Sequence, residues 1–555
     1  MMTAESRDQF SDKLFYLLLF IGIALNATGL FSPILEPDSA LYASIAKRIA
    51  LSNDWINLYG DGGDWLDKPH FPFWMAAAAF KIFGVGSFSY KLPAFLCWLL
   101  GIRFTYLLTG LLYNKRIAQF AVIIYVTALH AVIANFDVRA ESYLTCCVMA
   151  GLYYMYRIQQ DKNLRYIIFA AFFIACAVMT KGIFILVTIA GGFVIYWLLK
   201  KDWKQFINYR WWLMLLLIFI FILPELYALY VQFDLHPEKI IFGHTNVSGV
   251  KFFFWDSQFG RFFNTGPIKG KGDPTFFLHT TLWAFLPWSV LFVTALVQLF
   301  RRKTTFKKEH IVVYGSAAIT FILFSFSGFQ LPHYIVIIFP HFSIITAAYV
   351  YSIAEKQKVV SRLMVVHTGL NILLTLAIIT LVIFCGFPFM YVIAGIILII
   401  GVSSIWFFRK PNAGNLIVKG FFFAVLLYPF LNLVFYPNIL KYQSGMQAAN
   451  WMKANSINAP VGSYIKHSYS LDFYSTADVT RLENTEAVKI YAAATPVIIY
   501  TSKEYGDSLM AANFKVELLK TFSFYPVSRL NLKFLNAKTR ESQLEPIVLL
   551  RISNQ

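Results

Sequence analysis

The chain has 555 residues, of which 58% are hydrophobic and 14% are charged, and its formal net charge is +19. Soluble domains carry about 25% charged residues, and an apolar chain of this length buries its surface in lipid. The composition therefore excludes a soluble cytosolic enzyme, a disordered protein and a nucleic-acid-binding protein. An excess of Lys and Arg is typical of the cytoplasmic loops of membrane proteins. The five cysteines lie in apolar runs and predict neither a disulfide framework nor a Cys-based zinc site.

Thirteen apolar runs are candidate transmembrane helices, because a helix needs about 20 apolar residues to cross a bilayer. They predict an all-α polytopic membrane protein, with a transmembrane domain over residues 1–436. We expect the first run to be a retained helix, since no small-residue cleavage site follows it. The predicted spans are 13–32, 91–113, 117–136, 138–156, 164–180, 183–199, 208–230, 275–300, 311–328, 332–353, 363–385, 388–408 and 415–436.

The loops between the runs differ in charge, and this difference predicts the orientation. With the N-terminus in the cytoplasm, every inner loop carries Lys or Arg, as at Lys115, Lys200 and Lys356. The outer hinges near Gln330 and Gly386 carry neither. Basic residues collect in cytoplasmic loops. We therefore expect a multi-pass protein of the cytoplasmic (inner) membrane, with an odd number of spans and a periplasmic C-terminal domain.

Residues 437–555 turn mixed and polar, and they predict a small extracytoplasmic α/β domain. Residues 443–455 fit an amphipathic helix, and four segments have strand composition: 460–465, 497–500, 516–524 and 547–552. We find no glycine-rich phosphate loop or metal-ligand cluster in this part of the sequence. We expect the domain to cover or guide an acceptor, or to stabilise the fold.

The outer loop over residues 33–90 is rich in carboxylates and is the expected catalytic loop. Asp38 follows the first span and is expected at the N-cap of a short helix, with Tyr42 one turn further along. Asp67 and Lys68 begin an Asp-Lys-Pro turn, where Lys68 can neutralise a phosphate. The alternatives are a plain N-cap for Asp38 and a lysine that snorkels at the membrane interface.

The hinge between the third and fourth runs contains Asp137, Arg139 and Glu141. Ionisable residues at a membrane are costly, which makes them functional candidates. Asp137 and Glu141 are four positions apart and share a helix face if the helix begins early. The alternative is a structural ion pair with Arg139.

Three further outer segments carry single candidates. Lys181 lies in the tight turn between the fifth and sixth runs. Arg261 lies in a loop over residues 241–274, whose glycines and lysines let the backbone approach an anion. A flexible solvated loop explains the same composition. His333 and Tyr334 begin the tenth run.

Together these motifs resemble the membrane glycosyltransferases of the GT-C fold. Within that fold they are similar to the aminoarabinose transferases that modify lipid A and to the protein O-mannosyltransferases (glycosyltransferase families 39 and 83). The matching motifs, over about residues 14–436, are Asp38 with Tyr42, Asp-Lys-Pro at 67–69, Glu141 with Leu144-Thr145, Thr180-Lys181-Gly182, Arg261-Phe262, Leu286-Pro287-Trp288 and Leu331-Pro332 with Tyr334.

The chain departs from this family at three motifs. Ser39 follows Asp38 where the family has Glu, and Asp67 stands where the family often has Glu. Glu141 stands where the family has Asp, and Asp137 lies one turn earlier. The sequence leaves open whether Glu141 or Asp137 is the second carboxylate of the site.

The resemblance implies a transferase that takes a sugar from a polyprenyl-phosphate-linked donor, since the outer face of the membrane has no nucleotide sugars. The acceptor is a lipid A-like molecule, a protein or a glycan, and the sequence does not name it. We expect the chain to contact membrane lipids and to bind no nucleic acid. The expected residues are Asp38, Glu141 and Asp137 for catalysis, Lys68, Lys181, Arg139 and Arg261 for the donor phosphate, and Asp67, Tyr42, Tyr334 and His333 for the substrate.

The sequence identifies no certain cofactor and leaves open whether a divalent metal ion is required, for which His244, His279 and His333 are candidate ligands. Two other functions stay open, a polytopic lipid flippase or transporter and a polysaccharide ligase. Transporters of inverted-repeat type have broken spans at matching places in two halves. The sequence shows no such repeat, which argues against a transporter.

Overall fold

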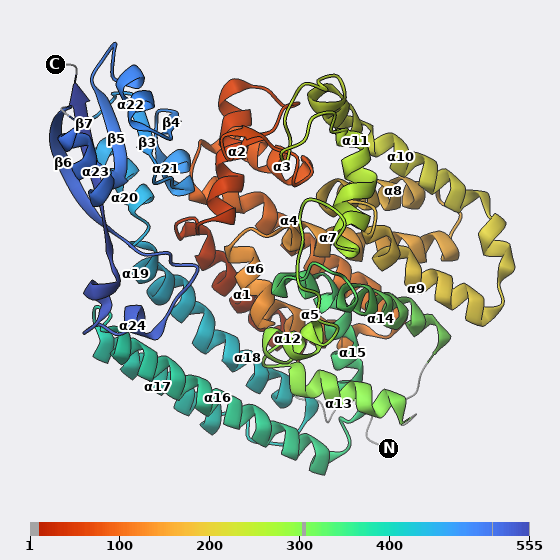
Figure 1. Ribbon diagram of the computed structural model, residues 1–555. Coiled ribbons are helices and arrows are strands. Elements are labelled where there is room, and N and C mark those ends of the chain that lie inside the picture. Colours follow the sequence, from red (N-terminus) through yellow and green to blue (C-terminus); the bar gives the residue numbers. More distant parts are fainter. Residues whose placement is uncertain (1–9, 302–306, 513, 554–555) are drawn as a thin grey trace.

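The structure is a computed structural model that describes residues 10–301, 307–512 and 514–553. It is mostly helical and carries a five-stranded sheet near its C-terminus (Figure 1). The helices are α1 (Asp12–Ala27), α2 (Asp38–Ser52), α3 (Phe71–Phe83), α4 (Ser87–Leu112), α5 (Lys115–Val126), α6 (Leu129–Phe136), α7 (Ala140–Gln160), α8 (Leu164–Lys181), α9 (Ile185–Lys200), α10 (Tyr209–Leu229), α11 (Gly249–Lys251), α12 (Phe276–Ala284), α13 (Ser289–Phe300), α14 (Ile311–Ser325), α15 (Phe339–Ser352), α16 (Gln357–Cys385), α17 (Met390–Trp406), α18 (Ala413–Pro429), α19 (Tyr436–Leu440), α20 (Ser444–Ala454), α21 (Tyr469–Tyr474), α22 (Thr485–Tyr491), α23 (Lys503–Ala511) and α24 (Leu532–Leu535). The strands are β1 (Tyr59–Gly60), β2 (Gly63–Asp64), β3 (Val461–Tyr464), β4 (Val479–Leu482), β5 (Val497–Ser502), β6 (Lys515–Phe524) and β7 (Glu545–Ser553).

The helices confirm a polytopic, mostly helical membrane protein. In the described part of the chain, 7 helical segments are long and apolar enough to cross a membrane, or up to 8 if the bent pair α5–α6 counts as one span. Each of the predicted runs overlaps at least one helix. Several of these helices are too short or too polar to be identified as transmembrane helices from their length and composition. The count of thirteen spans therefore stays a prediction.

Two of the predicted spans are broken in the middle. The run over 117–136 forms α5 and α6, which are bent by 54°, and the run over 275–300 forms α12 and α13. The breaks contact each other. The backbone N–H of Leu129 donates to the Leu286 carbonyl at 3.0 Å, and Trp288 Nε1 donates to Thr127 Oγ1 at 3.0 Å. Because exposed backbone groups need partners in an apolar interior, each break supplies partners for the other.

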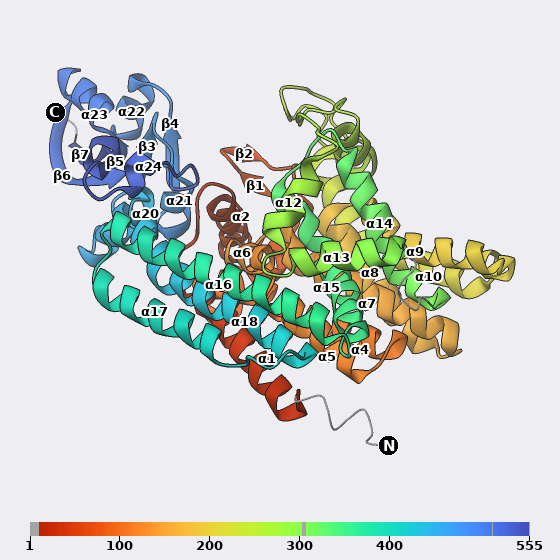
Figure 2. The same ribbon diagram turned by 90° about the horizontal axis from the view of Figure 1, so that it is seen from below.

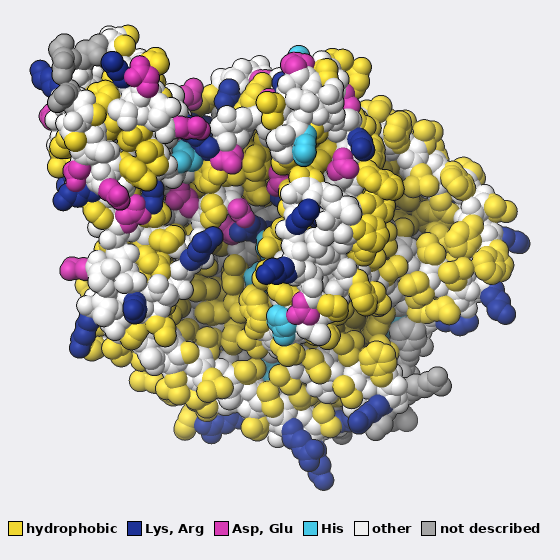
Figure 3. All heavy atoms as spheres, in the orientation of Figure 1, with side chains coloured by type: hydrophobic (Ala, Val, Ile, Leu, Met, Phe, Trp, Pro, Cys, Tyr) yellow, Lys and Arg dark blue, Asp and Glu magenta, His cyan; other side chains and the backbone are white. Residues whose placement is uncertain are grey.

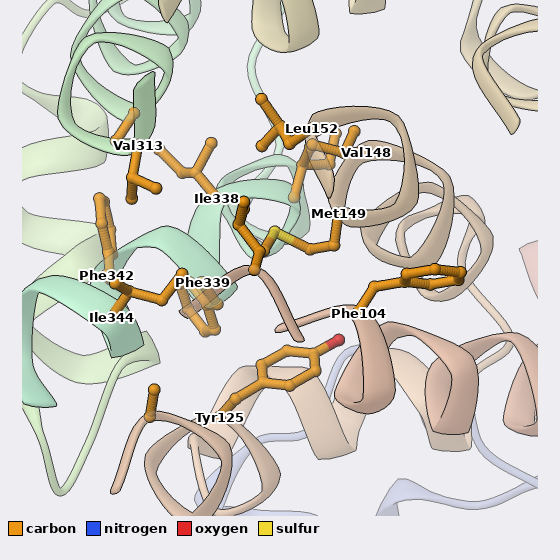
Figure 4. Close-up of a cluster of buried hydrophobic side chains, with 14 of the residues drawn as sticks. Phe104, Tyr125, Val148, Met149, Leu152, Val313, Ile338, Phe339, Phe342 and Ile344 are labelled. Carbon is orange, nitrogen blue, oxygen red and sulfur yellow. The ribbon is translucent and has the colours of Figure 1, made fainter. Parts of the chain in front are cut away.

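The helical core packs apolar side chains from segments that are far apart in the sequence. Figure 4 shows Phe104 of α4, Tyr125 of α5 and Met149 of α7 in one buried cluster with Ile338. The Tyr125 hydroxyl donates to Thr145 Oγ1 at 3.0 Å, so the polar end of this buried ring is also paired. Helix association in membranes rests on such packing, and the packed helices hold the loops in place.

The sheet near the C-terminus has the strand order β4-β3-β5-β7-β6. Strands β3, β4 and β5 run parallel, and β7 pairs antiparallel with β5 and β6. The four predicted strands and the predicted amphipathic helix, α20, are all present. Strand β4 was not predicted, because its four residues carry no apolar alternation. We call residues 437–553 the C-terminal unit; the boundary at 437 itself stays a prediction.

The polar and apolar parts of the molecule are separated in space. Figure 3 shows hydrophobic side chains covering much of the helical part, while Asp and Glu gather around the C-terminal unit and the neighbouring loops, and Lys and Arg lie also along the lower and right edges. Figure 2 shows the start of α1 at the lower edge of the molecule and the C-terminal sheet at the upper left. Helices α2 and α3 lie at the polar end beside the C-terminal unit, so the expected catalytic loop is held there.

Candidate functional site

A cavity of about 380 Å³ lies where the first outer loop meets the ends of several helices. Its walls come from α2, the Asp-Lys-Pro turn, the hinge before α7, the end of α8 and the segment that precedes α15. Apart from Asp137, every site residue predicted from the sequence lines this cavity: Asp38, Tyr42, Asp67, Lys68, Arg139, Glu141, Lys181, Arg261, His333 and Tyr334.

Arg139 joins two carboxylates at one wall of the cavity. Its Nη1 donates to Asp38 Oδ2 at 2.5 Å, and its Nε donates to Asp137 Oδ2 at 2.5 Å. Asp38 is partly exposed toward the cavity, whereas Asp137 is buried behind Arg139. Burial raises the pKa of Asp137 to about 6, against the opposing effect of Arg139. Asp137 therefore orients Arg139, and Asp38 is the carboxylate that a substrate can reach.

Glu141 and Lys181 form a second pair on the cavity wall. Lys181 Nζ donates to Glu141 Oε1 at 2.6 Å and lies 3.6 Å from the centre of the Tyr334 ring. The Glu141 side chain is 1% exposed. Its other oxygen, Oε2, is buried and has no hydrogen-bond partner among the described residues. A buried acceptor without a partner is costly, and this one belongs to a residue that lines the cavity.

Asp67, Lys68 and Arg261 form a third cluster at the Asp-Lys-Pro turn. Lys68 Nζ lies 3.0 Å from Asp67 Oδ2, and Arg261 donates to both the side chain and the backbone carbonyl of Asp67. Burial opposes ionisation of Asp67, but Lys68 and Arg261 outweigh it and hold the pKa of Asp67 below its usual range. Burial and the charge of Arg261 lower the pKa of Lys68 to about 8. Two cations thus share one carboxylate, which leaves net positive charge for an anion.

The Asp-Lys-Pro turn is held by a buried acid that the sequence analysis missed. Glu225, in the last turns of α10, accepts from the backbone N–H of His70 at 3.0 Å. The His70 ring Nδ1 lies 2.9 Å from Glu225 Oε1, and Nε2 lies 2.9 Å from the Ile56 carbonyl. Glu225 also lines the cavity. A carboxylate inside an apolar run was the signal that could have found it, because such residues are functional candidates.

One expectation about this region is wrong, and the condition attached to a second one is not met. Asp38 is not an N-cap: it is the first residue of α2, Pro37 precedes it as the cap, and no side chain caps the helix. The Asp38 carboxylate bonds Arg139 instead of the helix backbone. Asp137 and Glu141 do not share a helix face, because α7 begins at Ala140 and Asp137 follows the last residue of α6, Phe136.

The candidate metal ligands do not come together. His333 lines the cavity, whereas His244 and His279 are exposed residues outside its lining. Among the described residues, no group of three or more His, Cys, Asp and Glu is arranged to hold a metal ion. These three histidines therefore do not fit a shared metal site.

The arrangement suits a ligand with one anionic group and polar neighbours. Lys68, Lys181, Arg139 and Arg261 supply four cations around one cavity. Each of these cations forms an ion pair with a carboxylate of the protein. Phe73, Phe184, Phe252 and other apolar side chains make the remaining walls. Charged donors in such water-poor surroundings stabilise a phosphate or a developing negative charge strongly.

Parts of the sequence are similar to known glycosyltransferases. Residues 67–227 match the family described as dolichyl-phosphate-mannose-protein mannosyltransferase. The chain is 24% identical over 340 residues to the undecaprenyl phosphate-alpha-4-amino-4-deoxy-L-arabinose arabinosyl transferase 1 of Pseudomonas fluorescens, covering 60% of this chain and 56% of that protein. The corresponding transferase of Edwardsiella ictaluri is 25% identical over 57% of this chain and 55% of its own length. The matches thus span just over half the length of these curated relatives.

The fold is that of a solved member of this group. ArnT from Cupriavidus metallidurans, in a crystal structure bound to undecaprenyl phosphate, superposes with a TM-score of 0.71 at 17% identity, covering 96% of this chain and 97% of that chain. Its apo structure gives a TM-score of 0.72 at 16% identity, with the same coverage. These comparisons confirm the predicted fold class and the resemblance stated from the motifs.

Proposed function

We propose that this chain is an integral-membrane glycosyltransferase, which moves a sugar from a polyprenyl-phosphate-linked donor to a lipid A-like, protein or glycan acceptor. The observation that carries the proposal is one cavity among apolar helices whose lining includes Lys68, Arg261, Asp38 and Arg139. The names of the relatives support it, since they are transferases that use undecaprenyl-phosphate-linked or dolichyl-phosphate-linked sugars. The match to just over half of those relatives makes the substrates of this chain part of the proposal.

The donor phosphate binds at Lys68 and Arg261, with Lys181 and Arg139 on the adjoining walls. As the sugar leaves, negative charge grows on the phosphate oxygen that was bonded to its anomeric carbon. Lysine and arginine donors stabilise that charge more in the transition state than in the ground state. The lipid tail lies among the apolar side chains that line the rest of the cavity.

Asp38 orients the acceptor and takes its proton. The acceptor oxygen forms a bond to the anomeric carbon while the bond to the donor phosphate breaks. The acceptor proton passes to the Asp38 carboxylate, and the lipid phosphate leaves with the electron pair. Attack from the face opposite the phosphate inverts the anomeric carbon. Arg139 holds Asp38 in place through the 2.5 Å hydrogen bond, and Asp137 holds Arg139.

The other cavity residues position the sugar. Glu141 Oε2 has no hydrogen-bond partner in the part of the chain that the structure describes, so a sugar hydroxyl is its natural donor. The remaining residues around the sugar and the phosphate are Tyr42, Asp67, His333 and Tyr334.

The orientation is also part of the proposal. The protein lies in the cytoplasmic membrane with residue 1 inside and the C-terminal unit in the periplasm, since the basic loops mark the inner side. The transmembrane domain over 1–436, with its catalytic loop over 33–90, then opens to the side where lipid-linked sugars are available. A reporter that is active only in the cytoplasm, fused after Gln555, should be silent.

The purified protein in nanodiscs with radiolabelled polyprenyl-phosphate sugars tests the proposal. Transfer releases free polyprenyl phosphate, whereas a flippase moves the lipid without breaking a bond. Mass spectrometry of lipid A, glycoproteins and wall polymers from a deletion strain identifies the acceptor. Loss of a sugar from one of these products in the deletion strain is the expected result.

A further inference from the structure

Helix α21 of the C-terminal unit lies against α2, the helix that begins with Asp38 (Figures 1 and 2). The two helices are more than 400 positions apart in the chain. Charged side chains from the first outer loop hold both ends of α21. We call Glu36, Lys47 and the helix between them the α21 clamp.

Glu36 holds the start of α21. Its Oε1 accepts from Ser468 Oγ at 2.6 Å and from the backbone N–H of Ser470 at 2.5 Å. The first N–H groups of a helix have no partner inside the helix, and Glu36 supplies one of the missing partners. The backbone N–H of Glu36 in turn donates to Oε1 of Gln443, a fully buried side chain of the C-terminal unit, at 2.8 Å. Glu36 precedes Asp38 by two residues, so this end of the clamp fixes the start of α2.

Lys47 holds the end of α21. Its Nζ donates to the backbone carbonyls of Asp472 at 2.8 Å and Ser475 at 2.6 Å. The Lys47 side chain is buried, with a residue exposure of 7%. A buried ammonium is costly without partners, and both of these hydrogen-bond partners belong to the C-terminal unit. The charge of Lys47 is therefore satisfied by the docked position of α21.

Apolar packing fills the space between the two ends. Phe473 is buried in a cluster with Ile45 and Ala46 of α2, and the other buried members of that cluster among the described residues come from 34–143. The Tyr474 hydroxyl accepts from the backbone N–H of Ile34 at 2.8 Å and lies 2.7 Å from Ser87 Oγ. The contact is thus apolar in its centre and hydrogen-bonded at its edges.

On its other side, α2 is tied to the hinge that carries Arg139. Ser39 Oγ donates to the Asp137 carbonyl at 2.6 Å. Helix α2 is therefore held between this hinge and the C-terminal unit, and Asp38 sits at the end where the two restraints meet. Neither Glu36 nor Lys47 lines the cavity.

We propose that Glu36 and Lys47 are positioning residues for sugar transfer, which dock the C-terminal unit on α2 and so keep the Asp38 carboxylate against Arg139. This inference rests on the proposed function of Asp38. Under this inference the C-terminal unit affects turnover through α2, because the docked unit fixes the position where α2 begins. Lys68 and Arg261 come from other elements, so the donor phosphate site does not depend on the clamp.

Lys47→Met tests the clamp, because methionine keeps the apolar stem and removes the ammonium. We expect kcat to fall by about 10–100-fold, since a displacement of about 1 Å at a reacting group costs on the order of 10²-fold. The donor KM should stay within about twofold, which separates positioning from substrate binding. Lys47→Arg should recover most of kcat, because a guanidinium donates to both carbonyls.

A matched control variant and a second clamp variant allow the test even if Lys47→Met does not fold. Lys466 pairs with Glu545 at 2.5 Å inside the C-terminal unit, so Lys466→Met should leave kcat unchanged. If Lys47→Met does not accumulate, Glu36→Ala removes the acceptor at the other end of α21 from a partly exposed position, and it should lower kcat about tenfold for the same reason.

Hydrogen–deuterium exchange gives a readout that needs no substrate. Amides of residues 38–52 should exchange faster in Lys47→Met than in the wild type, and Lys47→Arg should restore slow exchange. Unchanged kcat or unchanged exchange in Lys47→Met, with an active wild type, overturns the clamp alone. A wild type that turns over no lipid-linked sugar overturns the proposed function and with it the catalytic meaning of the clamp, even if the exchange differs.

Discussion

Arg139 donates to Asp38 at 2.5 Å across 101 positions of sequence, and this contact joins the first outer loop to the hinge before α7. The same guanidinium also bonds Asp137. The carboxylate that faces the cavity is thereby held by a cation, which is in turn held by a buried carboxylate. We interpret Asp38, Arg139 and Asp137 as the part of the site that orients the acceptor.

Asp38→Asn should lower kcat by about 10²–10⁴-fold, because the amide cannot take the proton of the acceptor. Folding should survive, since the amide oxygen still accepts from Arg139. Asp38 caps no helix, so Asp38→Ala should lack the loss of about 1 kcal/mol that removal of an N-cap causes. Thermal unfolding checks this second part. The control is Asp54→Asn in the same outer loop, and an active Asp38→Asn protein would remove Asp38 from the mechanism.

Lys68→Met should weaken the donor phosphate site. A charge-assisted hydrogen bond in a buried site contributes about 1.5–3 kcal/mol, so donor affinity or turnover should fall by ~10–100-fold. Lys81→Met, on an exposed part of α3, is the matched control. Full activity of Lys68→Met with normal donor dependence would shift the phosphate role to Lys181 or Arg261.

The pH dependence of kcat/KM should show the titration of Lys68. Burial and Arg261 lower the pKa of Lys68 to about 8, so its cation is present below about pH 8 and is lost as the pH rises through that value. The profile of kcat/KM reports ionisations of the free enzyme, and it should decline above pH 8. In Lys68→Arg the cation persists at high pH, so the alkaline decline should move upward. An identical decline in both proteins would assign it to another group.

Glu225→Leu should destabilise the protein and displace the Asp-Lys-Pro turn. The backbone N–H and the ring of His70 lose their buried acceptor, and each buried donor left without a partner costs about 1–3 kcal/mol. Glu225→Gln keeps an acceptor and should lose less stability. Unfolding in detergent measures the difference, with Glu309→Gln at the Lys200 pair as the control. Equal stability of Glu225→Leu and the wild type would contradict this role.

Much of the helical fold could be predicted, because an apolar run of about 20 residues is long enough to cross a bilayer as a helix. The strands 497–500 and 547–552 were also predictable, since their β-branched and aromatic composition is strong. Strand β4 was not, because four residues with weak alternation carry little signal. The site residues come from short loop motifs whose order resembles a known family, and nearly all of them line one cavity.

The remaining features depend on contacts that no local pattern encodes. Glu225 faces His70 across 155 positions, and Lys47 reaches Ser475 across 428. A single sequence contains no information on such pairs beyond the cost of leaving them unpaired. The prediction of an N-cap at Asp38 was wrong for the same reason, because the actual partner of the Asp38 carboxylate, Arg139, is distant in the chain.

The release of free polyprenyl phosphate from a labelled polyprenyl-phosphate sugar tests the central claim most directly. The purified wild type in nanodiscs, supplied with the acceptor found by mass spectrometry, should release one polyprenyl phosphate for each sugar transferred. Asp38→Asn should release at least about 10²-fold less, while it still binds the donor through Lys68 and Arg261. Movement of the intact lipid-linked sugar across the bilayer, without cleavage of the sugar–phosphate bond, would contradict the account.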